Sequence, residues 1–597
     1  MIAGPALAVA WVAEAAALWW LSRRIAGPLI ELPAWTPRDG ATLAATLLLV
    51  PLLMVAPYRN LGSTGADGAR AYRAYFTADF VWHVALTEEV GRYEMPPRNP
   101  YMARERLHYY WTYFLVPAAA SSSGPAALRD VEAVLKVNAI GTATLLIASL
   151  FLLAWSAGVG AVAAALAVWI VVIAASAEGL VAIRDLWHSG APLARLRDMN
   201  VDAITAWKYG GLRVDGVHRT MFYTPQHGLS CTLGLLALVP MALSGASGRL
   251  GPIAASALLL GLSTTLNPFL GGAFSLIYGL SVLVDAVRTR APIVHVLRHA
   301  AAALPPGLAI AWGTINAMSE GAGEAVSIGW SGHARHAPVL TLLMSLGPAL
   351  VPALAGLVPR RAFATSPLVV AVCGLLVGLG LLYFVVLSEA SWVGFRAGQI
   401  LLALVTIPLA RTLAMIGEWS TTPVRRALAL AGVCGILAAG APTVLADTFN
   451  AADIANRGPG PGFPWTLTVT QGQQAALDWV KRHTAPTSVV QMDTMARGRG
   501  HWSFIPTFAG RRMAAGLPIS LLPRPEYQQV SRQVRTIFNA RNADAAHETA
   551  RRMGIDYLWV DDLDRKTYPA GTDLIAASPG HFAAVFDNGE VQLYRVR

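Results

Sequence analysis

The chain has 597 residues, of which 55% are hydrophobic and only 14% are charged, and its mean hydropathy of +0.48 excludes an ordinary soluble domain. The net charge of +11 would suggest nucleic acid as a partner of a soluble protein, but here arginines cluster in short loops between apolar stretches, as the positive-inside rule predicts, so we expect no nucleic-acid partner. Three cysteines, Cys231, Cys373 and Cys434, lie far apart within apolar stretches, which argues against a disulfide framework or a thiolate metal site.

Long apolar stretches predict a polytopic α-helical membrane protein. Stretches of 17 or more residues recur between residues 2 and 446, and each could cross roughly 30 Å of hydrocarbon as a helix. We predict twelve spans, at residues 2–22, 41–57, 130–154, 157–177, 225–244, 250–266, 268–286, 300–317, 337–358, 366–388, 396–416 and 424–446. The first stretch lacks a basic n-region and a clear cleavage site, so we expect it to be a retained helix and not a signal peptide.

The loop arginines predict the orientation of these spans. One set of alternate loops contains Arg23, Arg24, Arg38, Arg249, Arg288, Arg290, Arg298, Arg360, Arg361, Arg425 and Arg426. This set is predicted to be cytoplasmic. The loops 58–129, 178–224 and 318–336 and the C-terminal segment then lie outside, in a multi-pass protein of the inner (plasma) membrane.

The first outer loop begins with a candidate catalytic helix at residues 77–92, which contains TADFVWHVALTEEV. Its pattern predicts an amphipathic helix at the outer membrane surface, with Phe80, Val81, Trp82, Val84 and Leu86 in the interface. Asp79 and His83 are four residues apart and share a face. Both are candidate catalytic groups, while Glu88 and Glu89 are expected to face water. A structural role for Asp79 at the helix N-terminus, with a solvated His83, stays open.

The same loop continues through MPPRNPYMARERLHYYW, where three prolines disfavour helix and strand. This extended path carries the candidate ligands Arg104 and His108. It leads into residues 108–124, which are apolar but too short to span comfortably. We expect a re-entrant or interfacial helix there, with Tyr109, Tyr110, Trp111 and Tyr113 at the headgroup level.

Polar residues near the outer ends of later spans add candidates. HRTMFYTPQHGLS places Gln226 and His227 at a helix start, and STTLNPF offers Asn267 between two spans. Hydrogen bonds to loop carbonyls are the alternative for the histidines. Glu320, Glu324, His333 and His336 share one outer loop without a firm metal signature, so a divalent metal stays open.

The C-terminal part of the chain reads as a soluble domain. A Gly/Pro-rich linker at 447–464 precedes residues 465–597. A helix at 475–483, buried strands at 488–492 and 555–560, and a hairpin at 582–596 around Asp587-Asn588-Gly589 predict an α/β domain on the outer side.

These features together resemble the GT-C superfamily of membrane glycosyltransferases, which take sugars from polyprenyl-phosphate carriers. The similarity lies in the acidic residue that opens the loop helix, the Pro-Asn-Pro turn and the aromatic dipping segment. In the C-terminal segment, LDWVKRHTAPTSVVQMD and the FAGRR turn at 508–512 also look like the superfamily. The motifs are short, and no WWDxG follows the last span, which departs from the oligosaccharyltransferases. The extra N-terminal span makes 41–57 the counterpart of the usual first helix.

The resemblance implies an inverting transfer of a sugar from a polyprenyl-phosphate donor to an extracytoplasmic glycan, lipid or protein acceptor. Such a reaction needs a base for the acceptor hydroxyl and cations, or a metal, for the departing phosphate. Asp79 is the expected base, with His83 in support. The expected donor-phosphate or substrate ligands are Arg104, His108, Tyr109, Lys208, Gln226, His227, Arg396 and Arg511. Outer arginines also bind the headgroups of membrane lipids, so that role remains an alternative for each of them.

Two other functions fit the composition. A transporter or flippase of lipid-linked sugars would show repeated halves and charges at the bilayer midplane, and neither is evident in the sequence. The third hypothesis is a non-catalytic membrane assembly protein whose C-terminal domain is its binding module.

Overall fold

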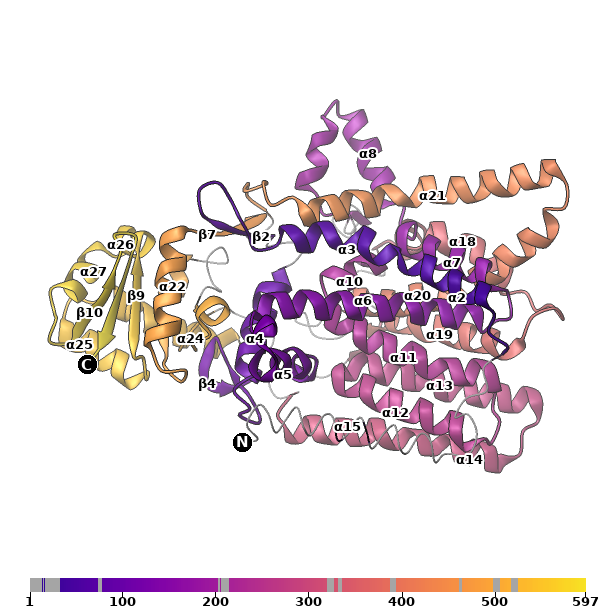
Figure 1. Cartoon of the computed structure of the whole chain (residues 1–597), viewed down its shortest axis with the longest axis horizontal. Helices are drawn as coiled ribbons and strands as arrows, with labels where there is room; N and C mark the ends of the chain where they lie inside the picture. The colour runs from indigo at the N-terminus through magenta and orange to yellow at the C-terminus, as the bar shows by residue number, and fades with distance from the viewer. Residues whose placement is uncertain are drawn as a thin grey trace.

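The computed structural model describes residues 13, 16, 33–73, 78–201, 204–205, 214–318, 327–330, 336–386, 393–460, 464–497, 505–516 and 524–597. A bundle of long helices forms one end of the molecule and a small sheet-containing domain forms the other (Figure 1). The predicted first span at 2–22 lies almost wholly outside the described residues.

The bundle has the helices of a multi-pass membrane protein. Among the described residues, eight helices are long and apolar enough to cross a membrane, or up to ten if each of two bent pairs is one span. The helices of the bundle are α2 (Pro37–Leu47), α3 (Leu49–Asn60), α6 (Val131–Trp155), α7 (Ala161–Ile173), α8 (Glu178–His188), α11 (Pro225–Ser244), α12 (Leu250–Leu266), α13 (Pro268–Thr289), α14 (Ile293–Ala300), α15 (Leu304–Ile315), α17 (Pro338–Ser345), α18 (Gly347–Gly356), α19 (Thr365–Phe384), α20 (Val393–Trp419) and α21 (Pro423–Ala452). Each predicted span from 41–57 onward coincides with one or two of these helices, so the polytopic architecture is confirmed.

Two predicted spans are bent. The stretch 337–358 forms α17 and α18, which meet at 92°, and α7 meets α8 at 42°. Pro348 is the second residue of α18 and has no N–H to donate to the Met344 carbonyl four residues earlier, so one continuous helix cannot run through this point. At the other end of the bundle, α21 continues to Ala452, beyond the predicted span end at 446.

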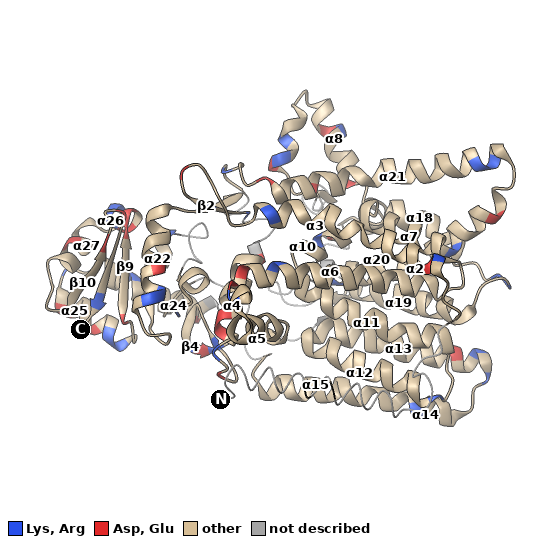
Figure 2. Cartoon of the chain, in the orientation of Figure 1, with Lys and Arg blue, Asp and Glu red and all other residues tan. Residues whose placement is uncertain are grey.

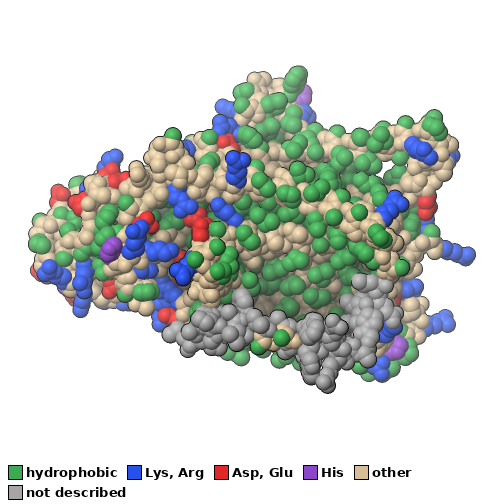
Figure 3. All heavy atoms as spheres, in the orientation of Figure 1, with side chains coloured by type: hydrophobic (Ala, Val, Ile, Leu, Met, Phe, Trp, Pro, Cys, Tyr) green, Lys and Arg blue, Asp and Glu red, His purple; other side chains and the backbone are tan. Residues whose placement is uncertain are grey.

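Charged residues are rare along the bundle and more frequent towards the two ends of the molecule. Figure 2 shows few charged residues along the helices, with Lys and Arg among those at the end of the bundle remote from the C-terminal domain. Hydrophobic side chains cover the visible face of the bundle in Figure 3, whereas charged side chains gather on the C-terminal domain. This distribution matches a helix bundle surrounded by lipid.

The loop between α3 and α6 forms a compact layer beside the bundle. Its elements are β1 (Ser63–Thr64), β2 (Arg70–Arg73), α4 (Ala78–Val90), β3 (Arg98–Asn99), β4 (Met102–Arg106), the 3₁₀ turn η1 (Trp111–Phe114), α5 (Leu115–Ser123) and the 3₁₀ turn η2 (Ala126–Leu128). The prolines do not prevent strand formation, because β3 and β4 pair as a short antiparallel hairpin. The prediction of an extended path without strands was therefore wrong.

Burial corrects two further expectations about this loop. Phe80, Val81, Trp82, Val84 and Leu86 are all buried, so α4 is packed inside the protein and does not lie in the membrane interface. Trp111 and Tyr113 are also buried, and Trp111 packs edge-to-face on Trp312 with ring centroids 5.4 Å apart. The predicted aromatic belt is instead part of the protein core.

The C-terminal domain is the predicted α/β domain. Its four-stranded sheet has the order β10-β11-β9-β8, in which β8 (Val490–Gln491) runs parallel to β9 (Tyr557–Asp561), while β10 (Phe582–Asp587) and β11 (Val591–Val596) form the predicted hairpin. The helices of this domain are α22 (Gln471–His483), α23 (Thr494–Arg497), α24 (Arg524–Phe538), α25 (Ala543–Arg552), α26 (Asp562–Thr567) and α27 (Pro569–Ala576), and a π-helical turn, η6 (Ile505–Ala509), faces the bundle.

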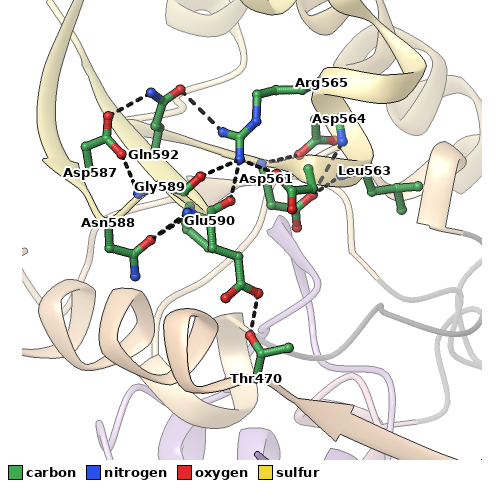
Figure 4. A network of polar contacts seen from close by, with 12 residues as sticks. Thr470, Asp561, Leu563, Asp564, Arg565, Asp587, Asn588, Gly589, Glu590 and Gln592 are labelled. Carbon is green, nitrogen blue, oxygen red and sulfur yellow. Dashed lines mark hydrogen bonds and ion pairs between the residues drawn. The ribbon is translucent and has the colours of Figure 1, made fainter.

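Polar contacts at one edge hold this domain together. Arg565 donates to Asp562 and to the Gly589 and Glu590 carbonyls of the hairpin turn, and the Thr470 hydroxyl that caps α22 hydrogen-bonds with the Glu590 carboxylate (Figure 4). The turn is thereby fastened both to α26 and to the start of α22.

A second sheet joins the domain to the first loop. Its order is β1-β2-β7, in which β7 (Thr466–Val469) pairs antiparallel with β2, Arg70 opposite Val469 and Arg73 opposite Thr466. Arg73 and Thr466 are thus paired in one ladder although nearly 400 residues separate them in the sequence. The C-terminal domain is therefore anchored to the layer that contains α4.

Candidate active site

Asp79 lies in the first turn of α4, partly buried, and faces a pair of tyrosines. A carboxylate in this position is stabilised by the helix N-terminus. Burial raises the pKa of Tyr109 and of Tyr110, and the nearby Asp79 carboxylate adds to both shifts, whereas Arg396 opposes the shift of Tyr110. Both phenols therefore remain protonated near neutral pH and can donate and accept hydrogen bonds beside the carboxylate.

The two tyrosines are fixed by packing. Their rings stack with centroids 4.0 Å apart, and Trp82 of α4 packs on Tyr109 at 4.8 Å. The Tyr109 hydroxyl accepts a long hydrogen bond of 3.4 Å from Gln226 Nε2 at the start of α11. The segment before η1 is thus held between α4 and α11.

Asn267 determines how His227 interacts with Tyr110. The Asn267 Oδ1 atom accepts from the backbone N–H groups of Phe269 and Leu270, both at 3.1 Å, and so caps α13. Its Nδ2 atom then faces His227 Nδ1 at 2.7 Å and can only donate. His227 must therefore accept at Nδ1 and carry its proton on Nε2, which lies 3.3 Å from the Tyr110 hydroxyl.

Arg396 of α20 supplies the cation of the site. Its Nη2 atom donates to the Tyr110 hydroxyl at 3.1 Å, and its guanidinium lies over the Phe269 ring, 6.0 Å from the centroid. The Tyr110 oxygen consequently receives the Arg396 and His227 N–H groups together. Asp79, Tyr109, Gln226, His227 and Arg396, which the sequence placed on four separate segments, come together around this point.

Tyr110 belongs to this site but was not predicted as a site residue, because the sequence pattern assigned it to an aromatic belt at the membrane surface. The available signal was its position next to Tyr109 at the start of the dipping segment. Asn267 was noticed only as a polar residue in a tight connection, and its role depends on the contact with His227, which sequence spacing does not reveal.

His83 lies beside this constellation, where it interacts electrostatically with His227. It is 2% exposed and packs against Phe114, with ring centroids 4.9 Å apart, and its Nε2 atom has no hydrogen-bond partner among the described residues. Burial lowers the pKa of His83 to about 3, so the ring is neutral at physiological pH. The ring is thus part of the packing around the site, and its catalytic role stays a prediction.

The glutamates of α4 were also misjudged. Glu89 is 1% exposed and receives Arg512 Nη2 at 2.6 Å, while Glu88 pairs with Lys481 at 3.1 Å. Both carboxylates face the C-terminal domain and neither is simply solvated.

Four other predicted ligands either make contacts outside the tyrosine pair or cannot be placed. Arg104 on β4 donates to the Arg552 carbonyl of the C-terminal domain, and His108 contacts the Ala317 carbonyl at 2.9 Å through Nδ1. Arg511 directs its donors to Thr484, Ala509, Gly510 and Lys481, so it supports its own turn and is not available for a phosphate. Lys208 lies outside the described residues.

His218, which precedes His227 in the same sequence stretch, belongs to a different buried cluster. Its Nε2 atom lies 3.2 Å from Asp447 Oδ2 of α21, and Arg219 lies 3.5 Å from the same carboxylate. Both residues lie on α10 (Val217–Phe222). Within the described residues, no group of three or more His, Cys, Asp or Glu side chains is arranged to hold a metal ion. Glu320, Glu324 and His333 fall outside those residues.

Comparison with protein-family models and with curated proteins found no match. Among solved structures, the apo oligosaccharyltransferase of Archaeoglobus fulgidus is 13% identical over 94% of this chain and 74% of that chain, with a TM-score of 0.49. The same enzyme with an inhibitory peptide and a dolichol-phosphate is 13% identical over 94% and 74% of the two chains, with a TM-score of 0.42.

A second protein, ArnT from Cupriavidus metallidurans bound to undecaprenyl phosphate, is 11% identical over 93% of this chain and 97% of that chain, with a TM-score of 0.44. Because all three TM-scores are below 0.5, we transfer no ligand, reaction or residue role from these structures.

Proposed function

We propose that the protein is a membrane glycosyltransferase that moves a sugar from a polyprenyl-phosphate donor to an acceptor hydroxyl or amide outside the cytoplasm. The observation that carries this proposal is the convergence of a carboxylate, two neutral phenols and a guanidinium on one point beside the helix bundle. Asp79 influences Tyr109 and Tyr110, and Arg396 donates to the Tyr110 hydroxyl. An acid–base group and a cation at one place match the two requirements of sugar transfer from a phosphate.

In the proposed reaction, Asp79 accepts the proton of the acceptor as its oxygen or nitrogen attacks the anomeric carbon. The bond between that carbon and the phosphate oxygen breaks, and the polyprenyl phosphate departs with the bonding electron pair. Arg396, assisted by the Tyr110 hydroxyl, offsets the charge that develops on the phosphate. Attack opposite the leaving group inverts the anomeric configuration.

The wider chain supports this assignment. The loop arginines predict that the end of the bundle beside the C-terminal domain faces outward, where lipid-linked donors present their sugars in such reactions. Among the described residues, most of the charged positions lie away from the middle of the bundle in Figure 2, which disfavours a transporter.

The test is transfer of labelled sugar by the purified protein from a panel of polyprenyl-phosphate monosaccharides, compared with Asp79→Asn. We expect the substitution to lower transfer by at least about 100-fold, because a positioned general base contributes roughly that much. Asp67→Asn is the matched control, since Asp67 lies in the same loop but pairs at the surface with Arg457 at 3.3 Å.

Equal transfer by the wild-type and Asp79→Asn proteins would refute Asp79 as the base. A folded wild-type protein that neither binds nor uses any donor of the panel would refute the glycosyltransferase proposal itself and favour the transporter or assembly alternatives.

A further inference from the structure

The two ends of α4 contact different parts of the molecule. Its first turn carries Asp79 to the tyrosine pair beside the bundle, while its last turn carries Glu88 and Glu89 to the C-terminal domain. Ten residues separate Asp79 from Glu89, so a helical rise of 1.5 Å per residue places them about 15 Å apart along the axis. A shift of the distal end is therefore transmitted along a short, continuous helix to the carboxylate.

Arg512 makes the strongest contact at the distal end. Its Nη2 and Nε atoms donate to Glu89 at 2.6 and 3.0 Å, in a two-pronged pair, and Nη2 also donates to Glu94 at 2.8 Å. The pair is enclosed, because the Arg512 and Glu89 side chains are only 7% and 1% exposed. Burial alone would lower the pKa of Arg512, but Glu89 and Glu94 hold it above its ordinary value.

Further hydrogen bonds connect the 505–512 segment to α4 and to the residues that follow it. Thr507 Oγ1 donates to the Val81 carbonyl at 2.9 Å, and Arg92 Nη2 donates to the Gly510 carbonyl at 2.6 Å. Gly510 has φ +60°, a conformation that favours glycine, and a Cβ there would lie 3.4 Å from the Glu88 carboxylate. The turn is thus shaped to fit closely against the helix.

Charges of both signs meet at this junction, where Arg98 also lies 3.8 Å from Glu94 and Arg511 lies near Glu88. Glu88, Glu89 and Glu94 from the first loop meet Arg92 of the same loop and Lys481 and Arg512 of the C-terminal domain. Lys481 and Glu88 are 51% and 26% exposed, so that pair is screened by solvent and contributes little, whereas the enclosed Arg512–Glu89 pair depends strongly on its geometry. Arg512 is therefore the member whose loss should matter most.

We infer that Arg512 is a positioning residue, through which the C-terminal domain holds α4 in the register that presents Asp79 to the acceptor. This inference rests on the proposed function of Asp79. It assigns the C-terminal domain a part in the transfer step, because that domain holds the helix that carries Asp79.

Two independent measurements on the full-length protein test the inference. The first compares kcat and the KM for the donor in Arg512→Lys and Arg512→Met with the wild type. Lysine keeps the charge but cannot form the two-pronged pair. Both variants should therefore lower kcat by tenfold or more, since a 1 Å misplacement of a reacting group can cost about 100-fold, with the KM for the donor nearly unchanged. Lys481→Met, at the exposed pair on the same helix end, is the matched control and should keep the wild-type kcat.

The second measurement is amide hydrogen exchange of residues 78–90, which needs no activity. Exchange should be faster in Arg512→Met than in the wild type while the bundle helices stay protected. Glu89→Arg combined with Arg512→Glu should restore part of the protection, and Glu89→Gln provides a milder variant if the exchanged pair does not fold.

The outcomes separate this inference from the proposed function. Unchanged exchange in α4 and unchanged kcat in a folded Arg512→Met protein would overturn the positioning role. A fall in kcat accompanied by an equal loss of donor binding and of protection throughout the bundle would show general destabilisation and would also overturn it. The third outcome is faster exchange confined to α4 in the Arg512→Met variant of a protein whose wild type transfers no sugar. It would support the contact by which Arg512 holds α4 and would reject the catalytic role of Asp79.

Discussion

At the scale of single residues, Asn267 decides which hydrogen bonds His227 can make. Because the Asn267 oxygen is committed to the N-terminus of α13, only its amide nitrogen remains for His227. We predict that Asn267→Asp keeps the helix cap, since Asp and Asn cap equally well, but presents an acceptor to His227 Nδ1. His227 would then carry a proton on Nδ1, and the direction of its bond to Tyr110 would be lost or reversed.

The expected result is a loss of transfer of about tenfold or more, with little change in Tm, because a wrong histidine tautomer disables a site without unfolding it. The measurement is kcat as a function of pH beside a thermal melt. A loss of Tm as large as that of Asn267→Leu, which removes the cap as well, would contradict a purely directional role for Asn267.

The sequence indicates which residue types could take part in the reaction, but it does not indicate which other residues each of them contacts. Gln226 is predicted because a polar group at membrane depth is costly unless it has a use, whereas Asp79 is predicted from its position in the first outer loop and Arg396 from its position near an outer helix end. Arg511 was chosen on the same reasoning, yet it supports its own turn. Nothing in the local sequence distinguishes an arginine that saturates carbonyls from one that is free to bind a ligand.

At the scale of the element, the burial of α4 gives the protein a pH response. His83 has a pKa of about 3 in the folded protein, below its ordinary value of 6.5. Between these values the unfolded chain binds more protons than the folded one, so the free energy of unfolding must fall as the pH decreases from about 6.5 toward 3. The slope from this one group is at most about 1.4 kcal/mol per pH unit.

We predict that His83→Phe flattens this dependence, because phenylalanine suits the aromatic surroundings and does not titrate. The measurement is the Tm of detergent-solubilised protein across that pH range. His188→Asn serves as the control, since His188 is exposed in the folded protein and is solvated in both states. An equally steep fall of Tm in His83→Phe and the wild type would contradict the prediction.

The long apolar elements were predictable and α4 was not, for one physical reason. A membrane span is recognised by its own hydrophobicity and length, since the surrounding lipid is always the same. The surroundings of α4 are instead provided by α6 and η6. The start of η6 at Ile505 is more than 400 residues after the end of α4 at Val90. A helix with mixed polarity at a membrane surface and one enclosed by a distant domain have similar sequences.

At the scale of the whole molecule, the arrangement of charge predicts the orientation in the membrane. We expect a cysteine at Asp544, on the exposed surface of the C-terminal domain, to react with an impermeant maleimide in right-side-out vesicles. A cysteine at Arg425, at the opposite end of the bundle, should react only in inverted vesicles. Both variants should carry Cys434→Ser, because Cys434 is exposed on the helix surface. The reverse labelling pattern would place Asp79 on the cytoplasmic side and exclude the proposed acceptor location.

The ladder between β2 and β7 also has a consequence in time. Residues 70–73 leave the ribosome long before residues 466–469, and at 5–20 residues per second the interval is roughly 20–80 s. Throughout that interval β2 can pair only with β1 of its own loop, because β7 has not been made, and α4 lacks Arg512. The nascent protein would therefore insert its membrane helices first and complete its candidate catalytic layer only when synthesis is nearly finished, so that a truncated chain would occupy the membrane without a working site.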